Sequence, residues 1–527
     1  MLKRKSLLVL LSITLVVPGL SLTAGAQSKS KLIRNIDIKR KDVFHEVESK
    51  PRFLYQWANS LHIVTKENVV RRMLLFKEGD RFDPDILEES ERKLRALSYL
   101  GEVRLTVENK DSCCVDIRVL TQDQWSTLLS YIFSQGGGRT TLGGSVEEFN
   151  VLGFGKRIFV EARHEKNEGA TLTASYTDPQ LFFSRWTTEE RLVTGPFVTI
   201  FSGRIIRPFY SLDTKWAGGV DGEIRDETLR FFPQGIESEE SRLKFENKQI
   251  RFFAARAFGS RFKKTKLQLT YRLQERGFFA TGDSARLPND ELIHALTLTT
   301  SFENLAFVKE KQIDKFVKTE DLTLGTIVRV SLGRTRLPVP IGIRRFEMSA
   351  SLRRAQRVFQ SQYLIFILGF QTLFERDTIA SLRLQYYNRL LRNQTLAFNV
   401  EFDYAKNLEI SREFRLGGDS GLRGYGARRF TGKKSRLLIN LEDRIFTPFN
   451  ILTVAIGGVV FLDAGNVWDV NQTIRLSDLK FSAGFGLRLG YTKSPNSRIS
   501  RIDFGWKINH GGGFGVSIGI DQQFTLR

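Results

Sequence analysis

Long hydrophobic runs are missing from this 527-residue chain. After the N-terminus, no segment holds the roughly 18 consecutive apolar residues that a membrane-spanning helix needs. A membrane protein with this sequence would have to be a closed β-barrel, because only helices and barrels satisfy every backbone polar group in lipid. Proline is sparse, at 12 residues, whereas phenylalanine is abundant, at 42. Few strand breakers and many aromatics favour a chain of many long strands.

Cysteine and histidine are also scarce. The two cysteines, Cys113 and Cys114, are adjacent, and adjacent cysteines cannot easily adopt relaxed disulfide geometry. We interpret them as structural residues, with a strained redox pair or an intermolecular disulfide as the alternatives. Gly418-Asp-Ser-Gly421 resembles the nucleophile segment of trypsin-like proteases, but none of the five histidines lies in a protease motif, so Ser420 is interpreted as a turn residue. We expect no enzymatic activity, no cofactor and no metal site.

Acidic residues are fewer than basic ones, 58 against 80, and the formal net charge is +22. Nucleic acid is the first partner to consider for a basic chain. The basic residues are spread along this sequence rather than clustered, and the N-terminal residues discussed next predict export away from nucleic acid, so we expect no nucleic-acid partner. Anionic lipid or lipopolysaccharide is the partner that this charge favours, and a solvated barrel interior and rim is the alternative explanation of the charge.

Residues 1–26 have the features of a signal peptide. Lys3, Arg4 and Lys5 precede the apolar run 7–17, and Ala24-Gly-Ala26 provides a small-residue cleavage site. A membrane anchor is the alternative, which the shortness of the run disfavours. We therefore expect export into an oxidising compartment.

Residues 27–124 are predicted to form one small α+β domain of order β-α-α-β-β. Asp83-Pro84 supplies an N-cap and a first-turn proline, and the alternating runs 103–107 and 115–119 predict a hairpin. This order, with Phe-Lys-Glu-Gly-Asp at 76–80 and Ser-Glu-Arg-Lys-Leu-Arg at 90–95, resembles a POTRA domain. Another small α+β domain is the alternative.

Residues 125–527 alternate apolar and polar side chains between glycine-containing turns. In 436–446, Asn440, Glu442 and Arg444 lie opposite an aliphatic face, and 514–524 places Phe514 and Phe524 on one face. A soluble sandwich is the alternative. Charge on one face of successive strands favours a membrane barrel with a wet lumen, since a dry core could not accept it.

Two motifs are the most specific. A glycine-rich loop carries Leu-Arg423-Gly424-Tyr425, and a later strand carries Phe461-x-Asp463-x-Gly465. With the segments 148–155, 176–179 and 207–216, they resemble the BamA superfamily of outer-membrane assembly and secretion proteins. The resemblance implies a mainly β fold: a transmembrane antiparallel barrel of about sixteen strands, preceded by one POTRA-like domain in the periplasm.

The resemblance also implies a latch inside the barrel. The loop of Arg423, Gly424 and Tyr425 would fold into the lumen, where Arg423 would pair with Asp463, and Glu442 is a second acidic candidate. Periodicity independently places Phe461, Asp463 and Gly465 on one strand face, where glycine leaves room for a loop tip. The alternative is that Arg423 is a solvated loop residue.

The function that the resemblance implies is an outer-membrane insertase or translocase that uses no nucleotide. Unfolded client proteins would add a strand to the POTRA-like domain and then enter the seam between the first strand, 126–134, and the last, 514–524. Gly511, Gly512 and Gly513 would weaken pairing at that seam. Other assembly-complex subunits are further candidate partners. Family chains often end in an aromatic residue, so either Phe524 serves in its place or the terminal signal is altered. A passive pore or structural barrel is the alternative function.

Overall fold

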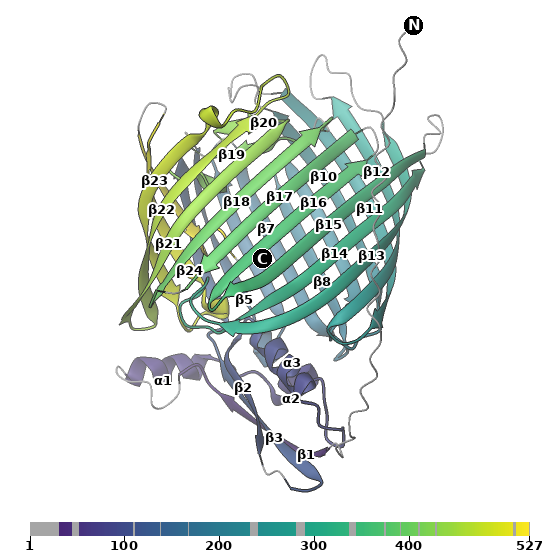
Figure 1. Ribbon diagram of the computed structural model, residues 1–527, viewed down its shortest axis with the longest axis vertical. Coiled ribbons are helices and arrows are strands. Elements are labelled where there is room, and N and C mark those ends of the chain that lie inside the picture. Colours follow the sequence, from purple (N-terminus) through teal and green to yellow (C-terminus); the bar gives the residue numbers. More distant parts are fainter. Residues whose placement is uncertain are drawn as a thin grey trace.

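A small N-terminal domain lies against one end of a large β-barrel in the computed structural model (Figure 1). The structure describes residues 31–44, 52–108, 111–136, 139–166, 168–231, 241–280, 290–336, 344–373, 376–389, 391–408, 412–426, 429–509 and 513–525. The expected signal peptide, 1–26, lies outside these residues. We call the barrel end next to the N-terminal domain the proximal end and the opposite end the distal end. None of the helices in the described residues is long and apolar enough to cross a bilayer.

The N-terminal domain is a three-stranded sheet with helices packed on it. The elements in chain order are β1 (Leu32–Lys41), α1 (Arg52–Leu61), α2 (Glu67–Met73), α3 (Pro84–Arg95), β2 (Leu100–Glu108) and β3 (Cys114–Asp123). The sheet order is β1-β3-β2, with β1 parallel to β3, and the predicted hairpin is β2–β3. As expected, Asp83 caps α3 by accepting the backbone N–H of Asp85. The helix α1 is an addition to the expected order.

The core of this domain follows from the alternation of its strands. One face of each strand meets α2 and α3, and the buried aliphatic side chains there form a continuous cluster. Its most buried members include Ile33, Val70, Leu94, Ile117 and Val119.

The barrel contains 20 strands in one closed antiparallel sheet. They are β4 (Thr127–Gly136), β5 (Arg139–Glu148), β6 (Arg157–Glu165), β7 (Gly169–Leu181), β8 (Trp186–Gly195), β9 (Val198–Arg207), β10 (Trp216–Phe231), β11 (Ser241–Gly259), β12 (Lys263–Ala280), β13 (Glu291–Glu310), β14 (Glu320–Arg336), β15 (Arg344–Phe359), β16 (Gln362–Leu373), β17 (Arg376–Asn388), β18 (Gln394–Lys406), β21 (Ser435–Ile451), β22 (Val454–Trp468), β23 (Lys480–Tyr491), β24 (Ile499–Lys507) and β25 (Phe514–Ile520). The expected fold class is confirmed, but the expected count of about sixteen is wrong. Most connections are short, so that a strand and its connection use about 20 residues rather than the 25 that sixteen strands require.

The strands place apolar side chains outward and polar ones inward. On β21, Asn440, Glu442 and Arg444 are buried in the lumen, whereas Leu441 between them is exposed on the outer wall. The same outward exposure recurs on β25 at Phe514, Val516, Ile518 and Ile520. An apolar exterior around a charged interior is the pattern of a barrel that meets lipid outside and water inside.

The chain end departs from the sequence expectation. The last strand stops at Ile520, and Asp521 takes a left-handed conformation with φ 62°. Residues 521–525 then turn into the lumen, where the ring of Phe524 lies 6.3 Å from that of Tyr387 on β17. Because β17 and β25 are separated around the barrel by five strands, this contact crosses the lumen. The prediction that Phe524 continues the lipid-facing side of the last strand is therefore wrong.

The seam between the first and last strands is the least regular part of the barrel. Strands β25 and β4 are neighbours in the closed sheet, yet they are the one neighbouring pair of twenty without a residue-by-residue register in the described residues. At seven residues, β25 is also the shortest barrel strand. Gly511 and Gly512 lie outside the described residues, and Gly513 precedes β25 with φ +118°.

Candidate functional site

The loop between β18 and β21 folds back into the barrel from the distal end. It contains a two-stranded ribbon, β19 (Phe414–Leu416) and β20 (Phe430–Gly432), followed inward by a short helical turn at Gly418–Ser420. Gly421 and Gly424 have φ of +110° and +90°, a conformation that L side chains rarely adopt. These two glycines let the chain reverse on each side of Leu422 and Arg423, both of which are fully buried.

Arg423 is held by two carboxylates at once. Its Nε and Nη2 donate to the two oxygens of Asp463 at 2.9 and 2.7 Å, and its Nη1 donates to Glu442 Oε1 at 2.7 Å. The backbone N–H of Arg423 also donates to Asp463, at 3.1 Å. The structure thus brings together the arginine and both acidic partners that the sequence singled out, in a bidentate geometry that strongly orients the guanidinium.

The strand motif supplies the surface on which this arginine rests. The guanidinium carbon of Arg423 lies 3.6 Å from the ring centre of Phe461, a cation–π contact. At Gly465 an added Cβ would come within 2.7 Å of both the Leu416 side chain in the loop and the backbone oxygen of Leu437 on β21, so glycine leaves room where the loop packs on the strands. Tyr425 donates from its hydroxyl to the carbonyl oxygens of Phe481 and Asn509, each at 3.3 Å.

The loop tip at Gly424 packs closely against the last two strands, β24 and β25. An added Cβ at Gly505 on β24 would lie 2.7 Å from the nitrogen of Gly424, and one at Gly515 on β25 would lie 3.0 Å from the Gly424 Cα. Gly505 and Gly515 are register partners across these strands, so together they form a flat seat for the loop backbone. The sequence alone does not reveal this packing surface, although Gly505 and Gly515 occupy corresponding places in two successive alternating strands.

Glu442 is shared between the loop and a second arginine. Its Oε2 accepts from Arg444 Nε at 2.9 Å, while Oε1 accepts from Arg423. Arg444 in turn donates to Asp314 at 2.8 Å and to the carbonyl oxygen of Phe524 at 2.6 Å. A chain of buried polar contacts therefore runs from the distal loop to the C-terminal tail.

A second chain of contacts joins the same two segments. Asp503 lies 3.8 Å from Arg423 and accepts from Arg488 at 2.7 Å. Arg488 Nε also donates to the side-chain oxygen of Gln522 in the tail, at 3.0 Å. Arg501 completes this side by donating to Asp503 at 2.7 Å. Four arginines thus face four carboxylates, and the buried cluster is formally neutral; its members are Arg423, Arg444, Arg488, Arg501, Asp314, Glu442, Asp463 and Asp503.

The proximal mouth is filled by the tail and by the β13–β14 connection, residues 311–319. Ile313 and Phe524 belong to one apolar cluster with Tyr363, Ile365 and Tyr387 on the barrel wall. Lys315 Nζ pairs with Asp521 at 2.6 Å and ties the two segments together.

The segment 148–155, which resembles a family motif, forms a proximal turn that docks the N-terminal domain. Asn150 donates to the Thr65 hydroxyl at 2.8 Å and accepts from Gly155 N–H at 2.7 Å. Thr65 in turn donates to buried Asp123. At Gly155, an added Cβ would meet the Tyr99 hydroxyl at 2.5 Å, so this close approach requires glycine.

Further ionic contacts fix the domain against the barrel. Arg95 on α3 donates to both oxygens of Asp321 on β14, at 2.9 and 2.7 Å. Lys318 lies nearby with its ammonium toward the carbonyl oxygens of Leu97 and Leu100, at 3.5 and 3.4 Å. Burial, assisted by the neighbouring charge of Lys315, lowers the pKa of Lys318 to about 8.

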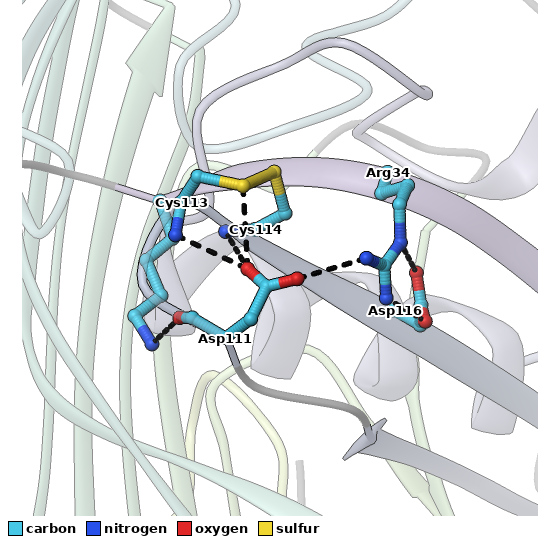
Figure 2. Close-up of a disulfide and its surroundings, with 6 residues drawn as sticks. Arg34, Asp111, Cys113, Cys114 and Asp116 are labelled. Carbon is cyan, nitrogen blue, oxygen red and sulfur yellow. Dashed lines mark hydrogen bonds and ion pairs between the residues drawn. A yellow bond between two sulfur atoms is a disulfide. The ribbon is translucent and has the colours of Figure 1, made fainter.

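The two cysteines lie at the start of β3, beside Asp111 and near Arg34 and Asp116 (Figure 2), and the β2–β3 hairpin to which they belong points away from the barrel (Figure 1). They form a disulfide with each other, contrary to the expectation from their adjacency. Asp111 Oδ1 accepts the backbone N–H groups of Cys113 and Cys114 at 3.1 and 2.6 Å, and Arg34 pairs with Asp111 and Asp116. Since both sulfurs are bonded, they provide no thiolate ligands beside Asp111.

Two family profiles match the chain. Residues 373–524 match the Omp85 superfamily domain, and residues 61–120 match POTRA, described as the surface antigen variable number repeat. The chain is therefore a member of the Omp85 (BamA) superfamily, as its motifs predicted. This membership indicates an outer-membrane barrel with a periplasmic POTRA domain, and it supports a role in protein assembly or secretion.

Similar solved structures include BamA from Haemophilus ducreyi lacking POTRA domains 1–3, at 13% identity over 93% of this chain and 84% of that chain, with a TM-score of 0.40. CdiB from Acinetobacter baumannii is 12% identical over 94% of this chain and 74% of that one, with a TM-score of 0.45. CdiB from Escherichia coli is 10% identical over 95% and 91%, with a TM-score of 0.43. A search of curated proteins gives no match. Because these similarities are low, the family assignment rests on the two profiles.

Proposed function

We propose that this protein is an insertase or translocase that passes client proteins through or into the outer membrane at the seam between β4 and β25. It performs no covalent chemistry and uses no nucleotide. Burial of a closed client barrel in lipid is itself favourable, so the protein needs only to lower the barrier to strand exchange. The clients are unfolded outer-membrane or exported chains.

The contact of the loop tip with the last strands is the observation that carries this proposal. Gly424 lies against Gly505 and Gly515, and Arg423 behind it is anchored to Asp463 and Glu442. The loop therefore braces β25, a strand of seven residues, from inside the barrel. Releasing the loop would remove this support and free a strand edge with unpaired backbone groups, which is the surface that an incoming strand can pair with.

The POTRA sheet offers an edge for first capture. Strand β1 is covered on its outer side, where the N–H of Ile33 donates to Asp80 and the N–H of Gly79 donates to Ile33. In the described part of the chain, no further strand pairs with the outer edge of β2. An extended client segment would therefore add to β2 through main-chain hydrogen bonds.

Site-specific photocrosslinking tests this function. A photoreactive residue at Leu129, exposed on β4, should capture nascent outer-membrane barrel proteins, and the same residue at Ile224, exposed on the distant strand β10, should not. Depletion should lower the level of the captured clients. A passive pore would give ion conductance with no adduct at either site and no change in any client, and this result would refute the proposal.

A further inference from the structure

The helix α1 is an addition to the POTRA domain. The β-α-α-β-β order, which is made by β1, α2, α3, β2 and β3, is complete without α1. Its ten residues, RFLYQWANSL, include three aromatics and no acidic side chain. Because the domain core forms from other elements, packing of that core does not explain why this helix carries so many large apolar residues.

One face of α1 holds the helix to the domain. The ring of Tyr55 stacks on Phe44 with centres 4.4 Å apart. Asn59 accepts the N–H of Phe44 at 3.2 Å and donates to its carbonyl oxygen at 2.8 Å. Tyr55 and Asn59 are four residues apart, so they lie on the same side of the helix.

The opposite face is apolar and uncovered. Phe53, Trp57 and Leu61 recur every four residues and are 68%, 65% and 58% exposed. Ile63, just beyond the helix, is 50% exposed. The three large apolar side chains on this face of α1 share one side of the helix rather than being scattered, and such a patch marks an interaction surface.

The position of α1 identifies what covers this patch. The helix lies crosswise to the barrel axis and projects sideways from the domain at the proximal end of the barrel (Figure 1). Its anchor Phe44 reaches the β23–β24 turn, where Lys493 Nζ lies 5.9 Å from the ring centre. The neighbouring β21–β22 turn exposes Phe449, Ile451 and Leu452 on the barrel exterior. The patch therefore lies at the same end of the barrel as these exposed apolar side chains.

We propose that α1 is an interfacial helix whose Phe53–Trp57–Leu61 face binds the phospholipid leaflet at the proximal, periplasmic end of the barrel. Tryptophan and phenylalanine favour the boundary between headgroups and acyl chains, and a helix in the membrane plane buries one apolar face there. The lack of carboxylates in α1 removes repulsion from anionic lipid. Bound in this way, the helix fixes the POTRA domain to the membrane beneath β23 and β24, close to the seam.

Photocrosslinking to lipid tests this assignment in the full-length protein. Trp57→p-benzoylphenylalanine and the control Gln56→p-benzoylphenylalanine are reconstituted in vesicles of phosphatidylethanolamine and phosphatidylglycerol. Gln56 is also exposed but polar, and it points about 100° away around the helix. A phospholipid adduct, identified by its mass, should form several-fold more at position 57. Equal yields, no lipid adduct, or capture of an added unfolded client peptide in its place would overturn the proposal.

Hydrogen–deuterium exchange provides a second measurement that does not use a photoreactive group. In the same vesicles, the α1 amides of the native chain should exchange several-fold more slowly than those of the Phe53→Ser/Trp57→Ser variant, while exchange in α2 stays unchanged. Unchanged α1 exchange in that variant would refute lipid binding. Faster exchange in both α1 and α2 would also refute it, because the apolar face would then stabilise the domain itself.

Discussion

Removing the charge of Glu442 tests the buried network at the residue that joins Arg423 in the loop to Arg444, which contacts the tail. In Glu442→Gln the side-chain shape is kept, but the one amide oxygen can accept from only one of the two arginines and the amide NH2 faces the other. Neither the 2.7 Å contact of Arg423 nor the 2.9 Å contact of Arg444 remains ionic. A hydrogen bond to a charged group contributes about 1.5–3 kcal/mol, and breaking a buried ion pair on one side costs about 3–5 kcal/mol. Arg423 keeps Asp463, so the loop remains docked most of the time.

We expect docking of the loop to weaken by about 3–5 kcal/mol, which raises the undocked fraction roughly a hundredfold to a few thousandfold. Trypsin added from the distal, extracellular side reports this change, because Arg428 and Arg429 lie in the loop sequence. Cleavage in Glu442→Gln should be faster by a comparable factor. The barrel should remain folded and heat-modifiable, since its strand ladders do not depend on this side chain.

The matched control is Glu413→Gln in the same loop. Glu413 pairs with Arg415 at 2.7 Å, but both side chains are partly exposed, and such a surface pair contributes only about 0–1 kcal/mol. Cleavage in this control should match that of the native chain. If Glu442→Gln is cleaved no faster than Glu413→Gln, the carboxylate shared by Arg423 and Arg444 does not hold the loop in the barrel.

Three other outcomes are expected. Phe524→Ala should release the tail, because loss of the buried ring costs about 3–5 kcal/mol, and a C-terminal tag should then become accessible to periplasmic carboxypeptidase. The control Val516→Ala, on the lipid face of β25, should leave the tag protected. Equal accessibility of the tag in the two variants would contradict the lumenal position of Phe524. Arg95→Ala should broaden the POTRA–barrel distance measured between spin labels, whereas Arg104→Ala, at an exposed pair, should not. The pKa of Lys318 is about 8 in the docked protein against an ordinary value of 10.5, so the undocked state binds more protons between these values and docking of the domain should strengthen as pH rises from 8 towards 10.5. Lys318→Met should abolish this pH dependence of docking. A pH dependence that persists in the variant would show that another group causes it.

Much of the barrel and its latch could be predicted from the sequence. Strand alternation shows which side chains share a face, and this placed Asp463 and Glu442 correctly toward the lumen. The pairing with Arg423 came from the family resemblance, since alternation within one strand does not reveal what reaches that face from a loop. The strand count was wrong because periodicity shows faces but does not show where each strand ends.

Other features depend on contacts between distant segments. Arg444 and Asp314 are 130 residues apart, and nothing in either local sequence indicates that the β13–β14 connection enters the lumen. Phe524 continues the apolar alternation of β25, so the sequence favours a lipid-facing position; the turn at Asp521 and the bond from Arg444 override that pattern. The packing surface formed by Gly505 and Gly515 could not be predicted, because two paired glycines indicate close packing only once a third segment, here the loop backbone at Gly424, is known to lie on both.

The network gives the loop and the tail a shared energetic dependence. If Arg423 leaves, Arg444 is the remaining ionic partner of Glu442. Arg444 also donates a hydrogen bond to the carbonyl oxygen of Phe524 in the tail. Asp503 and Arg488 repeat this connection to Gln522 on the other side. Because the cluster is buried and formally neutral, withdrawing the single charge of Arg423 leaves an uncompensated carboxylate inside the barrel, a cost that tail rearrangement can reduce. Undocking of the loop is therefore expected to loosen the segment that follows β25, which is the strand that a client at the seam must displace.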